Sequence, residues 1–262
     1  MHEDYNVFVK RVHHKYGIDL SLYKQKQMMR RTRSFYERYG FLSYEDFFTL
    51  GLIVDGEMEK RFIDRITINV SEFYRNRERW MDLHRLVLPE LIARNEALTI
   101  WSAACSTGEE AYTLRTLFSD QPKRDIKIIA TDIDEFVLLK AKRATYESKS
   151  LRELLPHEVT EYFNNEGRNY TVKDRYRTSI TFSKHDLLND AYIKGVHLIT
   201  CRNVLIYFTE EAKERILKRF VSSLTDGGFL FVGSTEQIFS PERYGLETYG
   251  SFIYRKTPLH EK

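Results

Sequence analysis

The sequence predicts an α/β protein in which a doubly wound, mostly parallel sheet follows a small helical domain. Two segments carry this prediction. The apolar run Leu98–Ala103 leads into a turn of small residues and then a helix, and the apolar run Ile126–Thr131 ends at the acidic Asp132. Alternating strands and helices build parallel sheets, and this order brings the turn and the carboxylate together at the carboxyl ends of neighbouring strands.

The N-terminal third is predicted to be helical. No strand-like alternation occurs before residue 97, and Ser21–Tyr39 carries apolar residues every seven positions, which form one stripe on a helix. Ser43–Asp46 resembles a capping box that starts a further short helix. A third helix is predicted over Glu57–Ile66.

The remainder of the chain repeats the strand–helix unit. Predicted strands cover Leu98–Ala103, Ile126–Thr131, Thr181–Lys184, Val196–Thr200, Phe229–Gly233 and Ser251–Arg255. Predicted helices cover Arg77–Arg94, Glu109–Phe118, Glu135–Thr145 and Glu210–Leu224. The repeated units favour a mostly parallel sheet with helices on both faces.

Residues 147–180 interrupt this rhythm, because a helix and the next strand are normally joined by only a few residues. The interval contains a turn-rich cluster and a β-prone run, so we expect an inserted antiparallel β subdomain. The expected domains are therefore a helical one over residues 1–76 and an α/β one over residues 77–262 that carries the insertion.

The composition of the 262 residues excludes several classes of protein. Apolar residues make up 42% of the chain, enough for a packed core, yet no uninterrupted apolar run reaches the roughly 18 residues of a membrane span. The first residues also lack the pattern of a secretory signal. Cys105 and Cys201 have no CxxC or zinc-like spacing, so we expect a cytoplasmic protein with no metal and no direct membrane insertion.

The net charge of +3 is unevenly distributed. Residues 1–40 contain nine Lys and Arg residues and four acids, a local charge of +5, so the other residues sum to −2. Lys26, Arg30, Arg31 and Arg33 lie on the helix predicted over Ser21–Tyr39 and are candidates for binding an acidic partner surface. A solvated amphipathic helix explains the same pattern, and nucleic acid is not expected because a recognised binding fold is absent.

The turn after Leu98–Ala103 indicates which ligand the sheet binds. Dinucleotide sites carry G-x-G-x-x-G because a pyrophosphate approaches the backbone closely, whereas here only Gly108 is present. Because alanine does not readily adopt a positive φ angle, we expect a less extreme turn than in a dinucleotide site. Asp132 follows Gly108 by 24 residues, near the spacing of an acid that binds ribose hydroxyls. An adenosine without phosphates fits, as in S-adenosylmethionine (SAM), although an ordinary strand-to-helix connection remains possible.

Three further polar segments are expected near the same edge of the sheet. His185–Leu187 ends one strand, and Cys201–Phe208 follows another. Ile66–Asn76 is a polar run at the expected domain junction, a common place for ligand clefts.

Five segments, in order along nearly the whole chain, resemble the bacterial chemotaxis receptor methyltransferases, the CheR family. They are NVSEFYR at Asn69–Arg75, WSAACSTGEE at Trp101–Glu110, TDID at Thr131–Asp134, CRNVLIYF at Cys201–Phe208 and VGSTE at Val232–Glu236. Two positions depart from the family's pattern: Ala111 stands where proline is usual, and Arg115 where a small residue is usual.

This resemblance implies the Rossmann-like fold of SAM-dependent methyltransferases. It also implies a protein-glutamate O-methyltransferase, which transfers a methyl group from SAM to glutamate side chains of chemotaxis receptors during sensory adaptation. The products are glutamate γ-methyl esters and S-adenosylhomocysteine (SAH). The implied partner is the cytoplasmic helical domain of the receptors.

The chemistry and the resemblance together suggest roles for individual residues. Cofactor contacts are expected at Asn69, Ser71, Arg75, Ala103, Glu110, Asp132, Asp186, Leu187, Cys201, Arg202 and Asn203. Among these, Asp132 is expected to accept the ribose hydroxyls, and Asp186 with Leu187 to contact the adenine. Asn203 is expected to shape a turn rather than to act in catalysis.

Arg75 and Tyr207 are the residues expected to orient the substrate carboxylate. A free glutamate has a pKa of about 4.3, so roughly one in 500 is protonated at neutral pH and no general base is needed. None of the eight histidines is therefore expected to be catalytic. The reaction depends instead on aligning the carboxylate oxygen, methyl carbon and sulfonium sulfur. A solvated arginine and a core aromatic are the structural alternatives.

Other functions stay open at this stage. One is a SAM-dependent enzyme acting on amines of nucleic acids or small molecules, although Arg202–Leu205 has no proline where such enzymes of nucleic acid place N/D-P-P-Y. Another is a scaffold that senses SAM without catalysis. A dehydrogenase is disfavoured by the missing glycines.

Overall fold

The computed structural model describes residues 2–94, 97–121 and 125–258. The chain forms two compact units: Met1–Asn69 with Tyr207–Glu214, and Val70–Ile206 with Arg215–Lys262. The first residue, on which the signal-peptide expectation partly rests, lies outside the described residues. The units divide after Asn69 rather than after residue 76, because the backbone that follows Asn69 hydrogen-bonds to the second unit.

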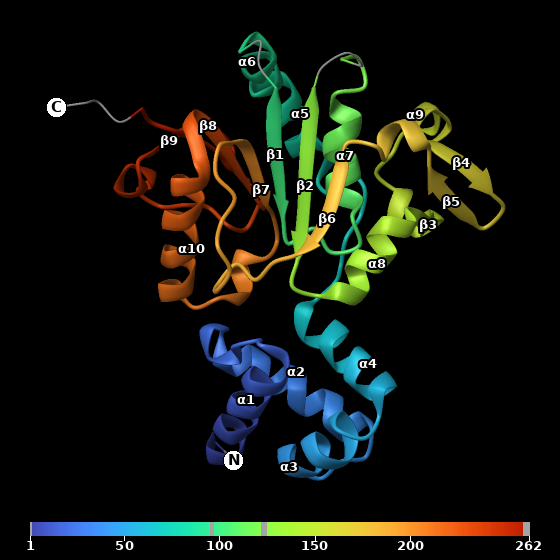
Figure 1. The fold of residues 1–262 in the computed structure, drawn as a ribbon, viewed down its shortest axis with the longest axis vertical. Helices are drawn as coiled ribbons and strands as arrows, with labels where there is room; N and C mark the ends of the chain where they lie inside the picture. Colours follow the sequence, from blue (N-terminus) through green and yellow to red (C-terminus); the bar gives the residue numbers. More distant parts are fainter. Residues whose placement is uncertain (1, 95–96, 122–124, 259–262) are drawn as a thin grey trace. The chain divides into compact units, whose positions relative to one another are not determined.

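The first unit is built from helices (Figure 1). They are α1 (His2–Tyr16), α2 (Gln25–Arg38), α3 (Tyr44–Asp46) and α4 (Gly56–Thr67), with a 3-10 turn at Leu20–Leu22 and a π-helical turn at Phe47–Leu52. Ser43 caps α3 by accepting the Asp46 N–H, as the capping box predicts. The helices bury an aromatic core around Phe8, Phe47 and Phe62, whose ring centroids lie 5.3–6.0 Å apart.

The helix predicted over Ser21–Tyr39 begins later than expected. The Asp19 carboxylate accepts the Ser21 N–H at 3.0 Å and so caps a separate 3-10 turn. Tyr23 is then extended and forms an antiparallel bridge with Phe208. Because extended backbone cannot continue a helix, α2 starts only at Gln25.

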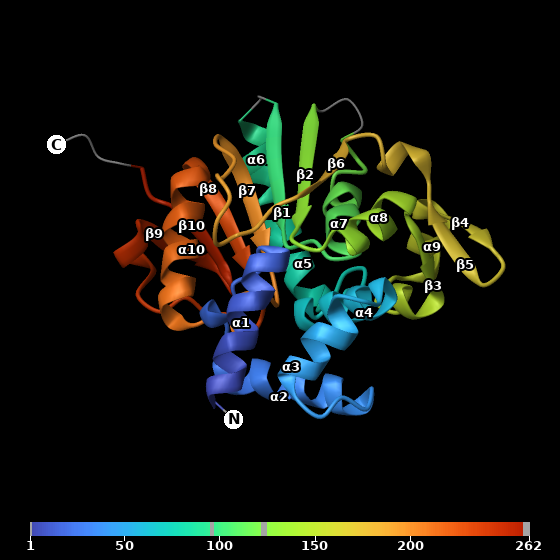
Figure 2. The ribbon, with the colours of Figure 1, turned by 60° about the horizontal axis from the view of Figure 1, so that its bottom comes forward.

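The second unit contains a seven-stranded sheet with the order β6-β2-β1-β7-β8-β10-β9 (Figures 1 and 2). The strands are β1 (Leu98–Ala103), β2 (Ile126–Asp132), β6 (Ile180–Lys184), β7 (Val196–Cys201), β8 (Leu224–Val232), β9 (Leu246–Gly250) and β10 (Ile253–Lys256). The first five in the order are parallel, and β10 is antiparallel to both neighbours. The predicted α/β class is confirmed.

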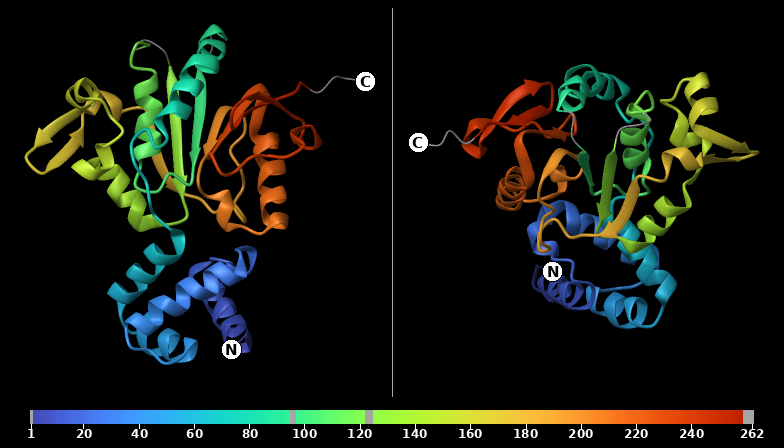
Figure 3. Two further views of the ribbon diagram at one scale, coloured as in Figure 1. Left: turned by 180° about the vertical axis from the view of Figure 1, so that it is seen from behind. Right: turned by 45° about the horizontal axis from the view of Figure 1, so that its top comes forward.

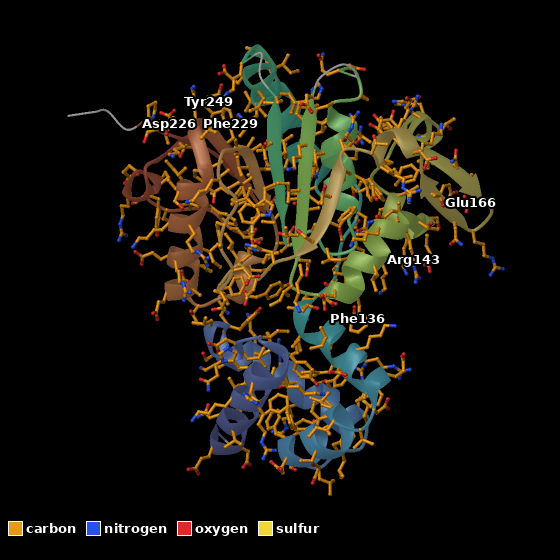
Figure 4. All side chains as sticks on the ribbon, in the orientation of Figure 1. Phe136, Arg143, Glu166, Asp226, Phe229 and Tyr249 are labelled. Carbon is orange, nitrogen blue, oxygen red and sulfur yellow. The ribbon has the colours of Figure 1, made fainter. Side chains whose placement is uncertain are left out.

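Strand β9 is absent from the sequence prediction, because its residues, LETYG, lack a regular alternation of apolar and polar side chains. It is an edge strand whose Tyr249 ring lies 5.1 Å from that of Phe229 on β8 (Figure 4). This contact across β10 fixes the antiparallel end of the sheet.

Helices cover both faces of this sheet. Those of the second unit are α5 (Arg77–Leu86), α6 (Leu88–Ala93), α7 (Glu109–Leu117), α8 (Glu135–Arg143) and α9 (Pro156–Tyr162), and α10 is Glu210–Ser223. Ile100 of β1 joins a buried cluster with α5, α6 and α7, whereas Trp101, the next residue, packs against Phe220 of α10. Figure 3 shows α5 and α6 across one face in its left view, opposite α10. Alternate strand residues thus serve two cores.

The single helix predicted over Arg77–Arg94 is in fact two helices. Pro89 stands at the first turn of α6 and has no N–H to donate to a preceding turn. The backbone therefore breaks after Leu86 and restarts at Leu88.

The predicted insertion forms a separate three-stranded antiparallel sheet with the order β3-β5-β4. Its strands are β3 (Thr145–Glu147), β4 (Phe163–Glu166) and β5 (Asn169–Val172). Gly167 turns the β4–β5 hairpin with a φ of 80°. The predicted inserted β subdomain is confirmed, and β3 extends it to Thr145, where the sequence prediction ended a helix.

Candidate functional site

The loop after β1 is more contorted than its sequence suggests. Ala104 and Ser106 have φ angles of 61° and 49°, and Gly108 has 94°. The expectation that alanine would avoid a positive φ angle in this turn is therefore wrong. Each left-handed non-glycine residue costs on the order of 1–2 kcal/mol, and such residues cluster where a ligand is bound. The Cys105 N–H, donated to the Thr131 carbonyl at 2.8 Å, ties this loop to β2.

Asp132 fastens the same loop at the end of β2. One of its carboxylate oxygens accepts the Ser106 N–H at 2.8 Å, and the other accepts the Asp134 N–H at 3.0 Å. Burial raises the pKa of this carboxyl to about 6, which these amide donors oppose. Asp132 thus joins the turn and the strand end that the sequence placed together, and its remaining lone pairs are able to accept ligand hydroxyls.

We expect SAH binding to weaken as the pH falls through about 6, because a protonated Asp132 turns one acceptor oxygen into a donor. Affinity should fall by up to about tenfold per pH unit below that value. The effect on stability has the opposite sign. The pKa of Asp132 in the folded state exceeds the unfolded value of about 3.9, so the folded state binds this proton more tightly. Asp132 therefore increases the free energy of unfolding as the pH falls from 6 to 4.

Calorimetric titration with SAH between pH 5 and 8 measures this dependence, and Asp132→Asn should flatten it. A wild-type affinity that is constant over this range would remove Asp132 from the binding site.

Glu110 is a buried carboxylate with two differently used oxygens. The Ser102 hydroxyl donates to Oε1 at 2.8 Å and the Thr200 hydroxyl at 2.6 Å. Oε2 lies 3.9 Å from a guanidinium nitrogen of Arg202. Burial raises the pKa of Glu110 above its ordinary value, and the charge of Arg202 opposes this shift. Because Ser102 and Thr200 pair across β1 and β7, Glu110 spans the carboxyl ends of two strands.

Arg202 follows β7 and is only 7% exposed. Its guanidinium lies 4.8 Å from the ring centroids of both Trp80 and Phe231. The Nη2 group donates to the backbone carbonyl of Arg75 at 2.7 Å. The structure therefore brings together two predicted site residues, Arg202 and Arg75, through backbone rather than side-chain contact. The Arg75 side chain donates to the Val70 carbonyl at 2.9 Å.

Glu236 holds the backbone of the site, and the sequence reasoning gave it no role. Its carboxylate accepts the backbone N–H groups of Asn203 at 2.6 Å, Gly233 at 2.7 Å and Ile206 at 3.2 Å. Asn203 itself is left-handed, with a φ of 61°. Glu236 thus fixes the turn after β7 from the end of β8. The VGSTE segment was the available signal, because it belongs to the motifs that carry the resemblance.

Gly233→Ala should lower the free energy of unfolding by about 1–3 kcal/mol, since an added methyl overpacks the site. The new Cβ would stand 2.7 Å from the Asn203 nitrogen and would collide with the Glu236 carboxylate. Gly56→Ala, where a Cβ meets open space, is the matched control and should be neutral. Urea unfolding of both variants tests this, and equal stability would contradict the packing of Gly233.

The loop that contains Asp186 and Leu187 is held from α10. Arg219 donates to the carbonyls of Leu187 and Leu188, both at 2.9 Å, and the Tyr192 hydroxyl donates to the Leu187 carbonyl at 2.7 Å. Asp186 caps its own turn by accepting the Leu188 N–H at 2.8 Å. Arg219 and Tyr192 were not predicted, because side-chain donors to backbone carbonyls leave no local sequence pattern.

The other predicted cofactor residues divide between the two units. Ala103 and Cys201 are fully buried at strand ends. Ser71, in the second unit, hydrogen-bonds to the buried Glu109. Asn69, in the first unit, donates to the Thr67 hydroxyl at 2.9 Å and to the Asp64 carboxylate at 3.2 Å.

Tyr207 belongs to the first unit, where the backbone of its segment pairs with the chain before α2. The Lys24 N–H donates to the Tyr207 carbonyl at 2.8 Å, and the Thr209 N–H donates to the Leu22 carbonyl at 2.9 Å. A cavity of about 190 Å³ adjoins it. It is lined by Lys24, Gln27, Met28, Arg31, Ile68 and Tyr207.

The cavity brings together the predicted catalytic Tyr207 and the predicted partner-binding Arg31. The Nη1 atom of Arg31 is buried and has no hydrogen-bond partner among the described residues. Burial and the neighbouring Arg65 lower the pKa of Arg31, which Tyr207 opposes. The site thus presents a guanidinium that is short of an acceptor. Lys26 and Arg30 are exposed, and Arg33 pairs with Glu37 at 2.7 Å.

Two features are absent from the described part of the chain. No group of three or more His, Cys, Asp or Glu side chains is arranged to hold a metal ion in residues 2–94, 97–121 and 125–258. No helix in the same ranges is long and apolar enough to cross a membrane.

The fold and the loops at the carboxyl ends of β1, β2 and β7 are those of a SAM-binding α/β methyltransferase. The family description "CheR methyltransferase, SAM binding domain" matches residues 69–250, and "CheR methyltransferase, all-alpha domain" matches residues 3–67. The chain belongs to the CheR methyltransferase family. It is a SAM-dependent enzyme of the protein-glutamate methyltransferase class that acts in chemotactic adaptation.

Similar proteins span nearly the same length. A chemotaxis protein methyltransferase of Listeria monocytogenes is 43% identical over 259 residues, which are 98% of each chain. Chemotaxis protein methyltransferase 1 of Pseudomonas aeruginosa is 32% identical, over 91% of this chain and 92% of its own. The crystal structure of a TehB-like SAM-dependent methyltransferase from Corynebacterium glutamicum aligns with a TM-score of 0.38 and 17% identity, over 69% of this chain and 93% of that one.

Proposed function

We propose that the protein methylates glutamate side chains in the cytoplasmic helical domain of chemotaxis receptors and that it works in the cytoplasm. The observation that carries the glutamate specificity is the cavity beside Tyr207, where the buried guanidinium nitrogen of Arg31 lacks an acceptor. A carboxylate supplies that acceptor together with a negative charge that pairs with the guanidinium, and a neutral amine lacks this charge. The acidic acceptor also matches the local charge of +5 over residues 1–40.

The cofactor would be held by the buried carboxylates. When bound, SAM supplies an electrophilic methyl group attached to a sulfonium sulfur. The Oε2 atom of Glu110 lies 3.9 Å from the cationic guanidinium of Arg202. The negative charge of Glu110 would also suit the α-ammonium group at the amino-acid end of SAM. Asp132 has acceptor capacity for ribose hydroxyls, and Asp186 with Leu187 forms the loop assigned to the adenine. These donor and acceptor types fit an adenosyl amino acid without phosphates.

The substrate carboxylate would be oriented by Arg75 and Tyr207. Because glutamate is already ionised at neutral pH, these groups have to bind and align the anion rather than remove a proton. The Arg75 guanidinium offers paired donors that match a carboxylate, and the Tyr207 hydroxyl offers one more. Ser71 and Asn69 would complete the methionine end of the cofactor site.

Methyl transfer to a receptor fragment tests this function. Purified protein, labelled SAM and the cytoplasmic fragment of a chemoreceptor should give label that is released by mild base, because γ-methyl esters hydrolyse there. Label that survives mild base would indicate N-methylation and would overturn the glutamate proposal. SAH binding without any transfer would indicate a SAM-sensing scaffold.

Receptor docking through Lys26, Arg30, Arg31 and Arg33 gives a separate prediction. Arg30→Glu should raise the KM for the receptor fragment about tenfold at low salt, because it reverses the charge of an exposed residue in this group of four basic side chains. The effect should fade at 0.5 M salt. Lys10→Glu, an equally exposed charge reversal on α1, is the control and should leave this KM unchanged. Equal effects of both variants would assign the result to net charge rather than to docking.

A further inference from the structure

Arg75 sits on an unusual piece of backbone. The residues on either side of it, Tyr74 and Asn76, have left-handed φ angles of 52° and 59°. Neither is glycine, so both conformations are strained and have to be held by their surroundings. Tyr74 is held by its N–H, which donates to the Thr113 hydroxyl at 3.1 Å, and by its hydroxyl, which lies 3.0 Å from that of Thr116.

The carbonyl between these strained residues is gripped by two buried side chains. The indole N–H of Trp80 donates to the Arg75 carbonyl at 3.1 Å, and Arg202 donates to the same oxygen at 2.7 Å. Trp80 is only 1% exposed, and its ring also forms one face against which the Arg202 guanidinium stacks. Trp80 therefore supplies one of the two donors directly and supports the second.

The burial of the Arg202 guanidinium is energetically unfavourable, which points to a specific role for it. Arg202 is buried with its Nε lacking a partner among the described residues, and burial lowers its pKa. The guanidinium lies 3.9 Å from the Glu110 carboxylate, but its hydrogen bond is to the loop carbonyl of Arg75, at 2.7 Å. Burying a guanidinium costs stability, and this hydrogen bond holds the backbone of Arg75. Trp80 and Arg202 both donate to the carbonyl of Arg75 itself, so their hydrogen bonds fix the direction in which the Arg75 side chain leaves the backbone.

We propose that Trp80 is a positioning residue for Arg75. Its indole N–H, with the stacked Arg202, locks the strained Tyr74–Asn76 backbone so that the Arg75 guanidinium is aimed before substrate arrives. This inference rests on the proposed role of Arg75 in orienting the substrate carboxylate. It predicts that the indole N–H contributes to the rate of methyl transfer and that this contribution passes through Arg75.

A double-mutant cycle tests the proposal. Trp80→Phe removes the N–H and keeps a ring for Arg202, so it should lower kcat about three- to tenfold, the effect of one net hydrogen bond. The Kd of SAH should stay within about twofold of wild type. In an Arg75→Ala background there is no guanidinium for Trp80 to position, so the same substitution should have no further effect on kcat. Single-turnover transfer of labelled methyl to the receptor fragment gives the rates.

Trp101→Phe is the matched control. It removes another buried indole N–H, which donates to the Thr131 hydroxyl at 2.9 Å on the opposite face of the sheet. Its effect on kcat, whatever its size, should be equal in both backgrounds. If Trp80→Phe unfolds on thermal melting, Trp80→Tyr, which also lacks the indole N–H, carries the same cycle.

Three outcomes would overturn the proposal. One is a loss from Trp80→Phe that is equal in both backgrounds, since it would mark a general structural role. Another is a loss of SAH affinity as large as the loss of rate, which would place Trp80 in cofactor binding. The third is full activity of Arg75→Ala alone, which would remove both this inference and the proposed role of Arg75, whereas the first two outcomes leave that role intact.

Discussion

Replacing Arg75 by alanine should lower kcat for receptor methylation about 100- to 1,000-fold, the loss typical when a donor that orients or stabilises reacting charge is removed. The nucleophile is an ionised carboxylate, so the barrier is governed by alignment, and the paired N–H groups of Arg75 are proposed to supply it. Arg75→Lys should recover part of the rate, since it keeps the charge and loses the planar pair of donors. SAH affinity should fall less than tenfold.

Arg79→Ala is the control for this substitution. Arg79 lies four residues further on, pairs with Asp82 at 3.1 Å and has no proposed role at the site. Its kcat should match that of wild type. Normal rate and normal cofactor affinity in Arg75→Ala would show that the assignment of Arg75 is wrong.

Glu110→Gln should weaken SAH binding about 10- to 100-fold. The glutamine side chain keeps an oxygen for the Ser102 and Thr200 hydroxyls, but it loses the negative charge proposed to bind the ammonium group of the cofactor. A hydrogen bond to a charged group is worth about 1.5–3 kcal/mol, which sets this range. The free energy of unfolding should also fall, because the buried Arg202 then lacks a compensating charge.

Glu158→Gln separates these two effects. Glu158 is a buried carboxylate in the same unit, and Arg77 pairs with it at 2.6 Å. This variant should lose stability and keep its SAH affinity within about twofold. Calorimetric titration and urea unfolding of both variants provide the comparison. If Glu110→Gln binds SAH as wild type does, Glu110 has a structural role only.

Much of the fold could be predicted because its elements are encoded locally. The strand β1 has the predicted bounds, and β7 extends one residue beyond them, since buried strands of a parallel sheet read as continuous apolar runs. The start of helix α2 and the edge strand β9 could not be predicted in this way. The start of α2 is set by the pairing of Tyr23 with Phe208, nearly two hundred residues away in the sequence, and β9 carries little apolar pattern.

The residues of the candidate site likewise include some that local sequence patterns predict and some that they do not. Asp132, at the end of β2, and Glu110, in the first turn of the helix α7 that follows β1, could be placed from the order of strands and helices. Trp80 and Glu236 could not, because each acts by a hydrogen bond to a backbone group, which leaves no local residue pattern. Trp80 bonds to Arg75, five residues away, and Glu236 to Asn203, 33 residues away. The positive φ angles of the β1 loop also escaped prediction, since local preference alone disfavours them at Ala104.

A crystal structure of the protein grown with SAH tests the central claim most directly. We expect the ribose hydroxyls within hydrogen-bond distance of Asp132, the adenine against Asp186 and Leu187, and the amino-acid end beside Glu110. An adenosyl group bound anywhere else, with these three positions vacant, would contradict the account.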